Sequence, residues 1–218
     1  MPRFQLYRIY TARLKKAGFG HVPVISLNLS GLEGNPGFKL TPSLIMRIVY
    51  GALFGDIFMK CVYHMRPYEA VPGTTDQIHR KWAKICKDFV SKGYPSRHKF
   101  KKLCRDIIHD LIRSKYWISK NPASGIVGEI LVKFLPAANN HLVELLEAEG
   151  AEAVVPDLAD FLQYCFYNQN FKVSHLGMKK SKALAGRLGV QAVEWFRSPA
   201  QKPSQKANIF HLLQKSNI

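Results

Sequence analysis

Glu129, Asn139 and Asn140 are the polar residues that the sequence places best for binding a ligand. Glu129 follows an apolar run that begins at Gly125, and the two asparagines precede an amphipathic segment that ends at Gly150. In open α/β sheets, ligands bind beyond the carboxyl ends of the strands, and helix N-termini favour anions. The pattern therefore predicts substrate binding by these three side chains. Two alternatives stay open: the asparagines only cap the helix, and Glu129 is only a surface carboxylate.

The glycines at 125 and 128 raise the question of a dinucleotide-binding fingerprint. That fingerprint needs G-x-G-x-x-G between a strand and a helix, because the glycines let a pyrophosphate approach the helix N-terminus. Here the third glycine is missing, and Pro136 stands between the strand and the helix. We favour a packing role for both glycines. The sequence also lacks G-x-x-x-x-G-K-[ST], which excludes a P-loop ATPase.

The segment around these residues predicts one βαβ unit. We expect a strand over 125–132, a helix capped by Asn139 or Asn140, and a second strand in "AEAVVP". A further helix then begins at Pro156 and Asp157. The first strand, the helix and the second strand together have the length of a single right-handed βαβ unit.

The residues before the βαβ unit have mainly helical periodicity. We expect a buried strand over 22–27, a helix from Thr41 to Met65 with Pro42 at its first position, and Thr75 or Asp76 as the next helix cap. The expected helices cover 3–17, 41–65, 77–90 and 97–117. The fold class is therefore α/β: a helix-rich N-terminal region with one short strand, followed by a partial Rossmann-like parallel sheet. We divide the chain into a basic helical region (1–120), the Rossmann-like segment (121–200) and a basic tail (201–218).

Positive charge dominates the chain, with 32 Lys and Arg against 15 Asp and Glu. The basic run over 80–105 contains aromatic residues, as a reader of nucleic-acid phosphates would. Those aromatics fall on the apolar faces of the expected helices, which predicts core positions for Trp82, Phe89, Tyr94 and Phe100. We favour a solvated or partner-facing surface over an anionic cofactor such as coenzyme A, and both over nucleic acid.

The four cysteines are far apart in sequence and form no CxxC pair. Cys61 with His64, and Cys104 with His109, could supply zinc ligands, but the second spacing does not share one helix face. We therefore expect buried, reduced thiols and no metal site. No signal peptide is indicated, and Arg47, Asp56 and Lys60 interrupt the most apolar stretch, so we expect a cytoplasmic protein without a membrane span.

Several segments together resemble a known family. "GIVGEILVKFLPAANNHLVELLEAEGAEAVVPDLADFLQYCFYN" is similar to a segment of 2-hydroxyacyl-CoA dehydratase-type proteins. "HVPVISLNLSGLEGNPGFKLT", "YGALFGDIFMKCVYHMRPYE" and "GTTDQIHRKW" look like the region before it in acyl-CoA dehydratase activase-related proteins. The resemblance covers roughly residues 3–212, and the combination is more specific than any one motif.

The resemblance implies an anaerobic iron–sulfur system. In that family an ATPase activator passes an electron to a component with Rossmann-like domains and a [4Fe-4S] cluster, which acts on a CoA thioester. Cys165 matches a position that is often cysteine in the family, but we do not assign it as a ligand. Because the expected cluster elements are missing, we expect a fragment or subunit that binds no cofactor alone and is inactive alone, with unknown catalytic residues. The alternatives are a basic nucleic-acid-binding module and a non-catalytic partner subunit.

Overall fold

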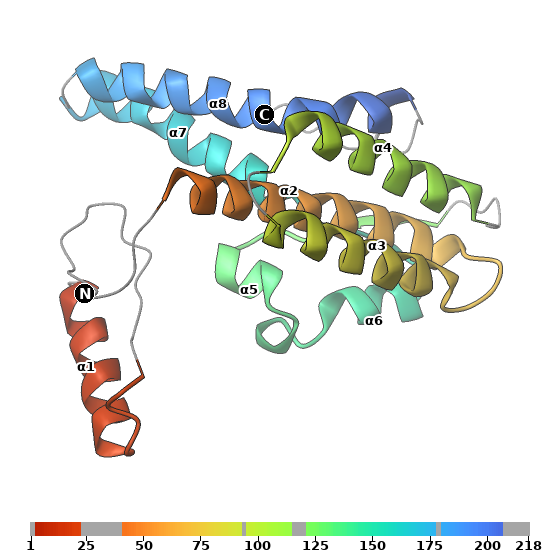
Figure 1. The fold of residues 1–218 in the computed structure, drawn as a ribbon, viewed down its shortest axis with the longest axis horizontal. Coiled ribbons are helices and arrows are strands. Elements are labelled where there is room, and N and C mark those ends of the chain that lie inside the picture. The colour runs from red at the N-terminus through yellow and green to blue at the C-terminus, as the bar shows by residue number, and fades with distance from the viewer. Residues whose placement is uncertain (1–2, 23–40, 93–94, 115–120, 178–179, 207–218) are drawn as a thin grey trace. The chain divides into compact units, whose positions relative to one another are not determined.

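The computed structural model describes residues 3–22, 41–92, 95–114, 121–177 and 180–206, in two compact units, Met1–Thr41 and Pro42–Ile218 (Figure 1). In the first unit, helix α1 spans Arg3–Lys16 and is followed by Gly18 at a φ of 85°. The strand expected over 22–27 lies, except for its first residue, outside the described residues. The second unit is mostly helical and contains every other described element.

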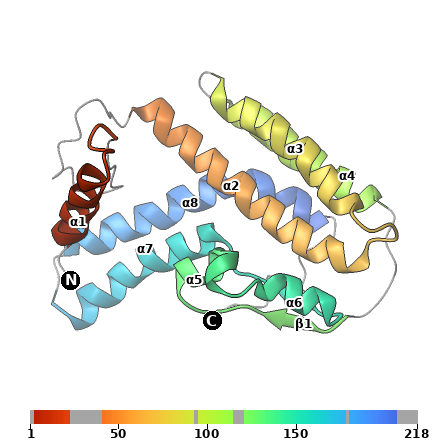
Figure 2. The same cartoon turned by 90° about the horizontal axis from the view of Figure 1, so that it is seen from below.

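Helix α2, Pro42–Met65, is the central element of the second unit. Its bounds agree with the prediction, because Pro42 suits the first helical position and the apolar residues occupy most of its circumference. It packs against α3 (Thr74–Ser91), α4 (Arg97–Arg113), α7 (Leu158–His175) and α8 (Lys180–Lys206) (Figures 1 and 2). None of the described helices is long and apolar enough to span a membrane.

The main core lies where α2, α3, α4 and α8 meet. Tyr50 and Phe54 of α2 pack against Phe100 of α4 with ring centroids 4.5 and 4.9 Å away. Trp82 and Phe100 are buried, as the apolar periodicity predicts, and Phe89 packs at the edge of the same core. Tyr94 lies outside the described residues. The described aromatic residues of the basic run, Trp82, Phe89 and Phe100, therefore pack in or at the edge of the core.

The start of α3 differs from the prediction. The N-cap is Gly73, at a φ of 86°, and not Thr75 or Asp76. After the short helix η1 (Arg66–Tyr68), the carboxylate of Glu69 accepts hydrogen bonds from the backbone N–H groups of Gly73 (2.6 Å) and Thr75 (2.9 Å). The cap prediction was wrong because an acceptor from the preceding turn satisfies these donors, which a search for Ser, Thr or Asp at the helix start does not detect.

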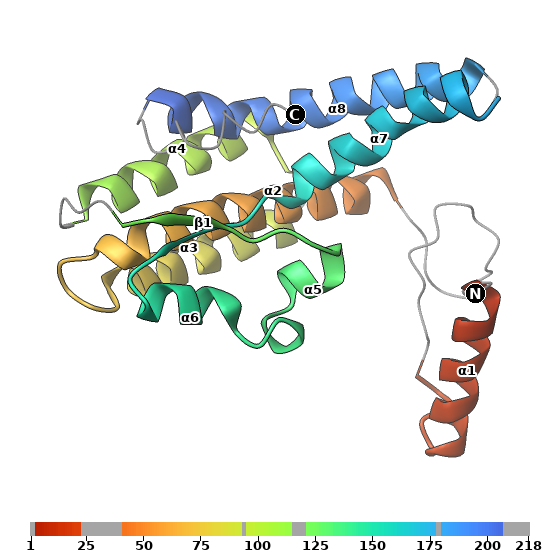
Figure 3. The ribbon, with the colours of Figure 1, turned by 180° about the vertical axis from the view of Figure 1, so that it is seen from behind.

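Two parallel strands form the sheet in the described part of the chain, β1 (Ala123–Gly125) and β2 (Glu152–Val154). Ala123 pairs with Glu152 and Gly125 with Val154. Between the strands lie α5 (Ile130–Phe134), η2 (Pro136–Ala138) and α6 (Leu142–Ala148). Figure 3 shows β1 between α2 and the α5–α6 segment. The fold is thus mostly helical with a small parallel sheet.

The strand expected over 125–132 was wrong beyond Gly125. Gly128 adopts a φ of 144°, and the next residue, Glu129, begins α5 as its N-cap. The apolar run that predicted a strand therefore becomes a short helix, because its capping carboxylate outweighs β-branched composition.

Helices α7 and α8 lie side by side as a hairpin (Figures 1 and 3), and Gly186 and Gly189 of α8 face Phe166 of α7. A Cβ atom added at Gly186 would lie 2.6 Å from the backbone oxygen of Phe166, and one added at Gly189 would overlap the Phe166 ring. The two glycines therefore set the distance between the helices. Because α8 also packs on α4 and β2 packs on α2, the helices from α2 to α4 share one compact unit with the elements after position 120.

Candidate functional site

Glu129 holds the N-terminus of α5. Its Oε2 accepts hydrogen bonds from the backbone N–H groups of Leu131 (2.8 Å) and Val132 (3.2 Å). These are two of the donors that a helix start leaves without an intrahelical partner. The carboxylate therefore lies beyond the carboxyl end of β1, as expected, but backbone groups of its own helix already occupy it.

Asn139 lies at the other end of α5 and connects it to α6. Its Nδ2 donates to the carbonyls of Val132 (3.1 Å) and Lys133 (3.3 Å), and its Oδ1 accepts from the N–H of Leu142 (3.2 Å). Asn140 and His141 follow with φ values of 56° and 54°, and His141 is the N-cap of α6. The cap predicted at Asn139 or Asn140 was therefore wrong by one or two residues, but Asn139 still satisfies the first N–H group of α6 from outside the helix.

The three predicted site residues therefore belong to one short segment around α5. Glu129 and Asn139 contact the N–H and the carbonyl of the same residue, Val132. These hydrogen bonds order the polypeptide at the carboxyl end of β1. Substrate binding by Glu129, Asn139 and Asn140 stays a prediction.

A buried charged cluster lies where β2 leads into α7, and sequence reasoning missed it. Asp56 of α2 accepts hydrogen bonds from the N–H groups of Leu158 (2.9 Å) and Ala159 (3.0 Å) at the start of α7. Four residues further along α2, Lys60 forms an ion pair with Asp157, the N-cap of α7. In the sequence these charges only interrupted an apolar stretch. Their four-residue spacing was the available signal, because it places both on one face of α2.

Arg197 of α8 completes this cluster by an ion pair with Asp160 (2.7 Å). Burial and the charge of Asp157 raise the pKa of Asp56 to about 6, although the hydrogen bonds from the start of α7 act to lower it. Burial would also raise the pKa of Asp160, but Arg197 and Lys60 hold it below its ordinary value. The cluster joins α2, α7 and α8, and its charges are satisfied by one another and by backbone donors.

A second polar cluster lies at the amino end of β2. The carboxylate of Glu152 contacts Nδ1 of His64 (2.7 Å) and accepts a hydrogen bond from the hydroxyl of Tyr68 (2.8 Å). Although burial acts to raise the pKa of Glu152, these two hydrogen bonds lower it. A carboxylate that orients an imidazole is half of a nucleophilic triad. Among the described residues, no serine, threonine or cysteine hydrogen-bonds His64.

Three of the four cysteines lie in the main core. Cys61 and Cys104 are fully buried, and Cys86 is 4% exposed. Burial raises the pKa of the Cys61 and Cys86 thiols to about 12 and also raises that of Cys104, where the neighbouring Cys86 and Cys61 add to the effect. Burial therefore favours the neutral thiol at these three positions. Cys165 of α7 is partly exposed.

Comparisons with known proteins assign no family to this chain. No protein-family model matches it. No curated protein and no solved structure matches it either. The chemistry proposed below therefore depends on the residues of the chain itself and on the resemblance seen in its sequence.

The exposure of the cysteines predicts a simple pattern of thiol reactivity. In the native protein, 5,5′-dithiobis(2-nitrobenzoate) is expected to modify Cys165 rapidly and the other three cysteines only at the rate of unfolding, because access and thiolate character control the reaction. All four are expected to react in guanidinium chloride. Cys165→Ser should remove the rapid phase. Rapid reaction of a second thiol in the native state would contradict the packing of the core.

Glu147 of α6 predicts a pH-dependent stability. Its Oε1 is buried and has no hydrogen-bond partner among the described residues, and Arg66 Nε lies 3.4 Å from Oε2. Burial raises the pKa of Glu147 to about 7, although Arg66 acts against the increase. Since the folded-state pKa exceeds the ordinary value, the ionised form costs stability above about pH 7, and this cost disappears as the pH falls toward 5.

Glu147→Gln is therefore expected to match the wild type at pH 5 and to exceed its free energy of unfolding by about 1–2 kcal/mol at pH 8.5. Urea unfolding at both pH values measures the difference. Glu152→Gln is the matched control of opposite sign: because the pKa of Glu152 is lowered, this variant should be less stable than the wild type at pH 7 and approach it in acid. Equal pH profiles for the two variants would refute the assignment.

Proposed function

We propose that the chain is a non-catalytic part of a 2-hydroxyacyl-CoA dehydratase or activase-related iron–sulfur system. In this proposal β1 and β2 belong to a larger Rossmann-like sheet that other polypeptide completes. The supporting observation is the sheet itself: within the described residues it has two parallel strands of three residues each. Parallel sheets are almost always larger, and both their faces and edges are covered.

Apolar side chains beyond the carboxyl end of β1 support the same proposal. Val127 is 83% exposed and Leu131 67% exposed, and Val132 and Leu135 are also exposed. All four follow β1 directly, in the segment that resembles the dehydratase-type proteins. Several exposed apolar residues in one short segment are typical of a surface that a partner covers.

The state of the cysteines explains why we place the chemistry outside this chain. A [4Fe-4S] cluster needs several thiolates that converge on one site. Cys61, Cys86 and Cys104 are packed among apolar side chains of the helical core, and Cys165 lies on α7 outside that core. The proposal therefore assigns a structural role in the assembly to this chain, while the cluster, the ATPase activator and the CoA thioester belong to its partners.

Anaerobic reconstitution with iron and sulfide tests the catalytic half of the proposal. We expect no stable [4Fe-4S] absorption or electron paramagnetic resonance spectrum from the isolated chain. A stable spectrum that disappears in Cys165→Ala would overturn the proposal. Cys86→Ala serves as the control for general damage, since Cys86 lies in the core.

Co-expression tests the assembly half. The products of flanking genes that encode an ATPase or cysteine-rich component are expected to co-purify with this chain and to protect the amides of the Val127–Leu131 segment from hydrogen exchange. Val127→Glu is expected to abolish co-purification without changing the fold, because Val127 is 83% exposed. Leu184→Glu, at an exposed position on α8, is the control. Equal loss in both variants would argue against assembly through the sheet.

The alternative function is a nucleic-acid-binding module, favoured by the exposed lysines of α3 and α4. Since Trp82 and Phe100 are buried, neither of these aromatic residues of the basic run can stack on bases, and binding there would depend mainly on phosphate charge. Charge alone gives dissociation constants of about 10⁻⁴ to 10⁻⁶ M at physiological salt. Titration of labelled duplex and single-stranded DNA decides the question: sub-micromolar affinity would favour the alternative.

A further inference from the structure

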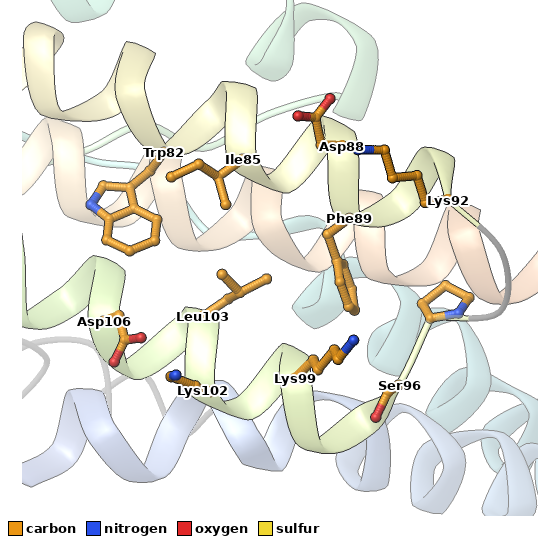
Figure 4. A pocket seen from close by; sticks show the side chains of 11 residues that line it. Trp82, Ile85, Asp88, Phe89, Lys92, Ser96, Lys99, Lys102, Leu103 and Asp106 are labelled. Carbon is orange, nitrogen blue, oxygen red and sulfur yellow. The ribbon is translucent and has the colours of Figure 1, made fainter.

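A groove of about 560 Å³ lies between α3 and α4. The two helices pack more on α2 and α8 than on each other, which leaves the space between them open. Figure 4 shows apolar side chains from the two helices pointing toward one another in this space, namely Trp82, Ile85 and Phe89 from α3 and Leu103 from α4. A groove of this volume is within the range of small-molecule sites.

The apolar floor runs along α3 for about two turns. Trp82, Ile85 and Phe89 are spaced three and four residues apart, so they share one helix face over roughly 10 Å. Ile85 is 38% exposed, so part of the floor remains open to solvent. The floor thus offers a narrow apolar track long enough for an aromatic or medium-chain acyl group.

The charges of the groove differ between its two ends. Lys92 at the end of α3 and Lys99 in the first turn of α4 line one end, and Lys102 lies further along α4. Asp106 lines the other end, where Trp82 Nε1 also donates a hydrogen bond to Asp110 (2.9 Å). Asp88 also lines the groove, beside Lys92 (Figure 4). A ligand in the groove therefore meets two lysines and one carboxylate at one end, and Lys102 with carboxylates toward the other.

The start of α4 adds to the positive end. Ser96, its N-cap, lines the groove and makes no capping hydrogen bond through its side chain among the described residues. The first turn of α4 also contains no acidic residue. Free N–H groups and the helix dipole favour an anion at such a position. The helix N-terminus contributes only to the position of the ligand's anionic group. The lysines and the apolar floor form the rest of the site.

We propose that this groove binds an amphipathic organic anion. Its phosphate, sulfonate or carboxylate group lies at Lys92, Ser96 and Lys99, and its aromatic or acyl body extends over Phe89 and Ile85 toward Trp82. Charge-assisted hydrogen bonds fix the anionic group, and burial of the body supplies the remaining affinity. This site is separate from the β1–β2 sheet, so it does not depend on the assembly role proposed above.

Fluorescence titration with 8-anilinonaphthalene-1-sulfonate tests the proposal, because this probe combines an aromatic body with an anionic group. We expect one molecule to bind per chain. N-phenyl-1-naphthylamine, which has a similar body and no charge, should bind about tenfold more weakly or worse. Octanoate, but not octanol, is expected to displace the sulfonate probe.

Two variants separate the ends of the groove. Lys92→Glu with Lys99→Glu should weaken binding of the sulfonate at least about tenfold and leave the neutral probe within about twofold. Ile85→Asp should weaken both probes. The matched control, Lys84→Glu with Lys101→Glu, makes the same charge change at exposed positions of the same helices outside the groove, and should change binding less than about threefold. Circular dichroism checks each fold, and Lys92→Gln with Lys99→Gln replaces the first pair if it does not fold.

Three results would overturn the proposal. Equal loss in the control pair would mean that the probe senses only the general positive field. Equal affinity for the neutral probe would mean an apolar patch without an anion site. Tighter, Lys99-dependent binding of an acidic helical peptide or a polynucleotide would make the groove a macromolecular interface instead.

Discussion

Gly186→Ala is expected to lower the free energy of unfolding by about 2 kcal/mol. A Cβ atom at this position would lie 2.6 Å from the backbone oxygen of Phe166, and a backbone atom cannot move away as the end of a side chain can. Helices α7 and α8 must therefore separate. Alanine has a higher helix propensity than glycine by about 1 kcal/mol, which offsets part of the cost. Urea unfolding measures the net effect.

Gly55→Ala in α2 is the matched control. An added Cβ atom at Gly55 has no neighbour within 4 Å among the described residues, so only the helix propensity changes. This variant should gain about 0.5–1 kcal/mol of stability. The same substitution is therefore expected to have opposite signs in the two helices. A stabilising effect of Gly186→Ala would show that α7 and α8 are further apart at Gly186 than in this structure.

Asp56→Ala is expected to cost about 2–3 kcal/mol at pH 7. The substitution leaves the N–H groups of Leu158 and Ala159 without their acceptor, and the second of these hydrogen bonds is buried. An unpaired buried donor costs about 1–3 kcal/mol. Removing the repulsion between Asp56 and Asp157 returns part of this cost. Urea unfolding and the loss of amide protection at the start of α7 measure the change.

The cost of Asp56→Ala should also depend on pH. The folded-state pKa of Asp56, about 6, exceeds its ordinary value of 3.8, so the wild type gains stability as the pH falls from 7.5 to 5. The alanine variant lacks this gain, and the difference between the two proteins should increase by about 1 kcal/mol. Glu129→Ala is the control. It also removes an acceptor of two backbone N–H groups, but these are exposed, so the expected cost is below about 1 kcal/mol.

Local signals in the sequence were sufficient for several elements of the fold. Pro42 and an apolar circumference predicted α2, Asp157 predicted the start of α7, and Gly150, at a φ of 78°, ends the turn after α6 as expected. Each of these features depends on residues within one helical turn. The prediction of a strand over 125–132 was wrong because it did not take one local signal into account. The carboxylate of Glu129 caps a short helix there, although the apolar composition favours a strand.

Long-range contacts account for most of what the sequence did not predict. The charged cluster joins Asp56 to a helix start 102 residues away, and no periodicity connects the two segments. Cys61, Cys86 and Cys104 looked scattered, yet three helices bring them into one core. The α3–α4 groove also depends on how two helices pack against others. The predicted site residues lay close together in the sequence, so their proximity needed no tertiary information.

The hydrogen bonds of Asp56 also set an order of events during synthesis. Helices α3 and α4 follow α2 directly in the chain, so they can pack on α2 early. The donors for Asp56 are added 102 residues later, which at ribosomal rates of about 5–20 residues per second is a delay of roughly 5–20 s. Until then, the carboxylate of Asp56 lacks the two N–H donors that it has in the folded protein. The start of α7 can therefore dock on α2 only after most of the chain has been synthesised.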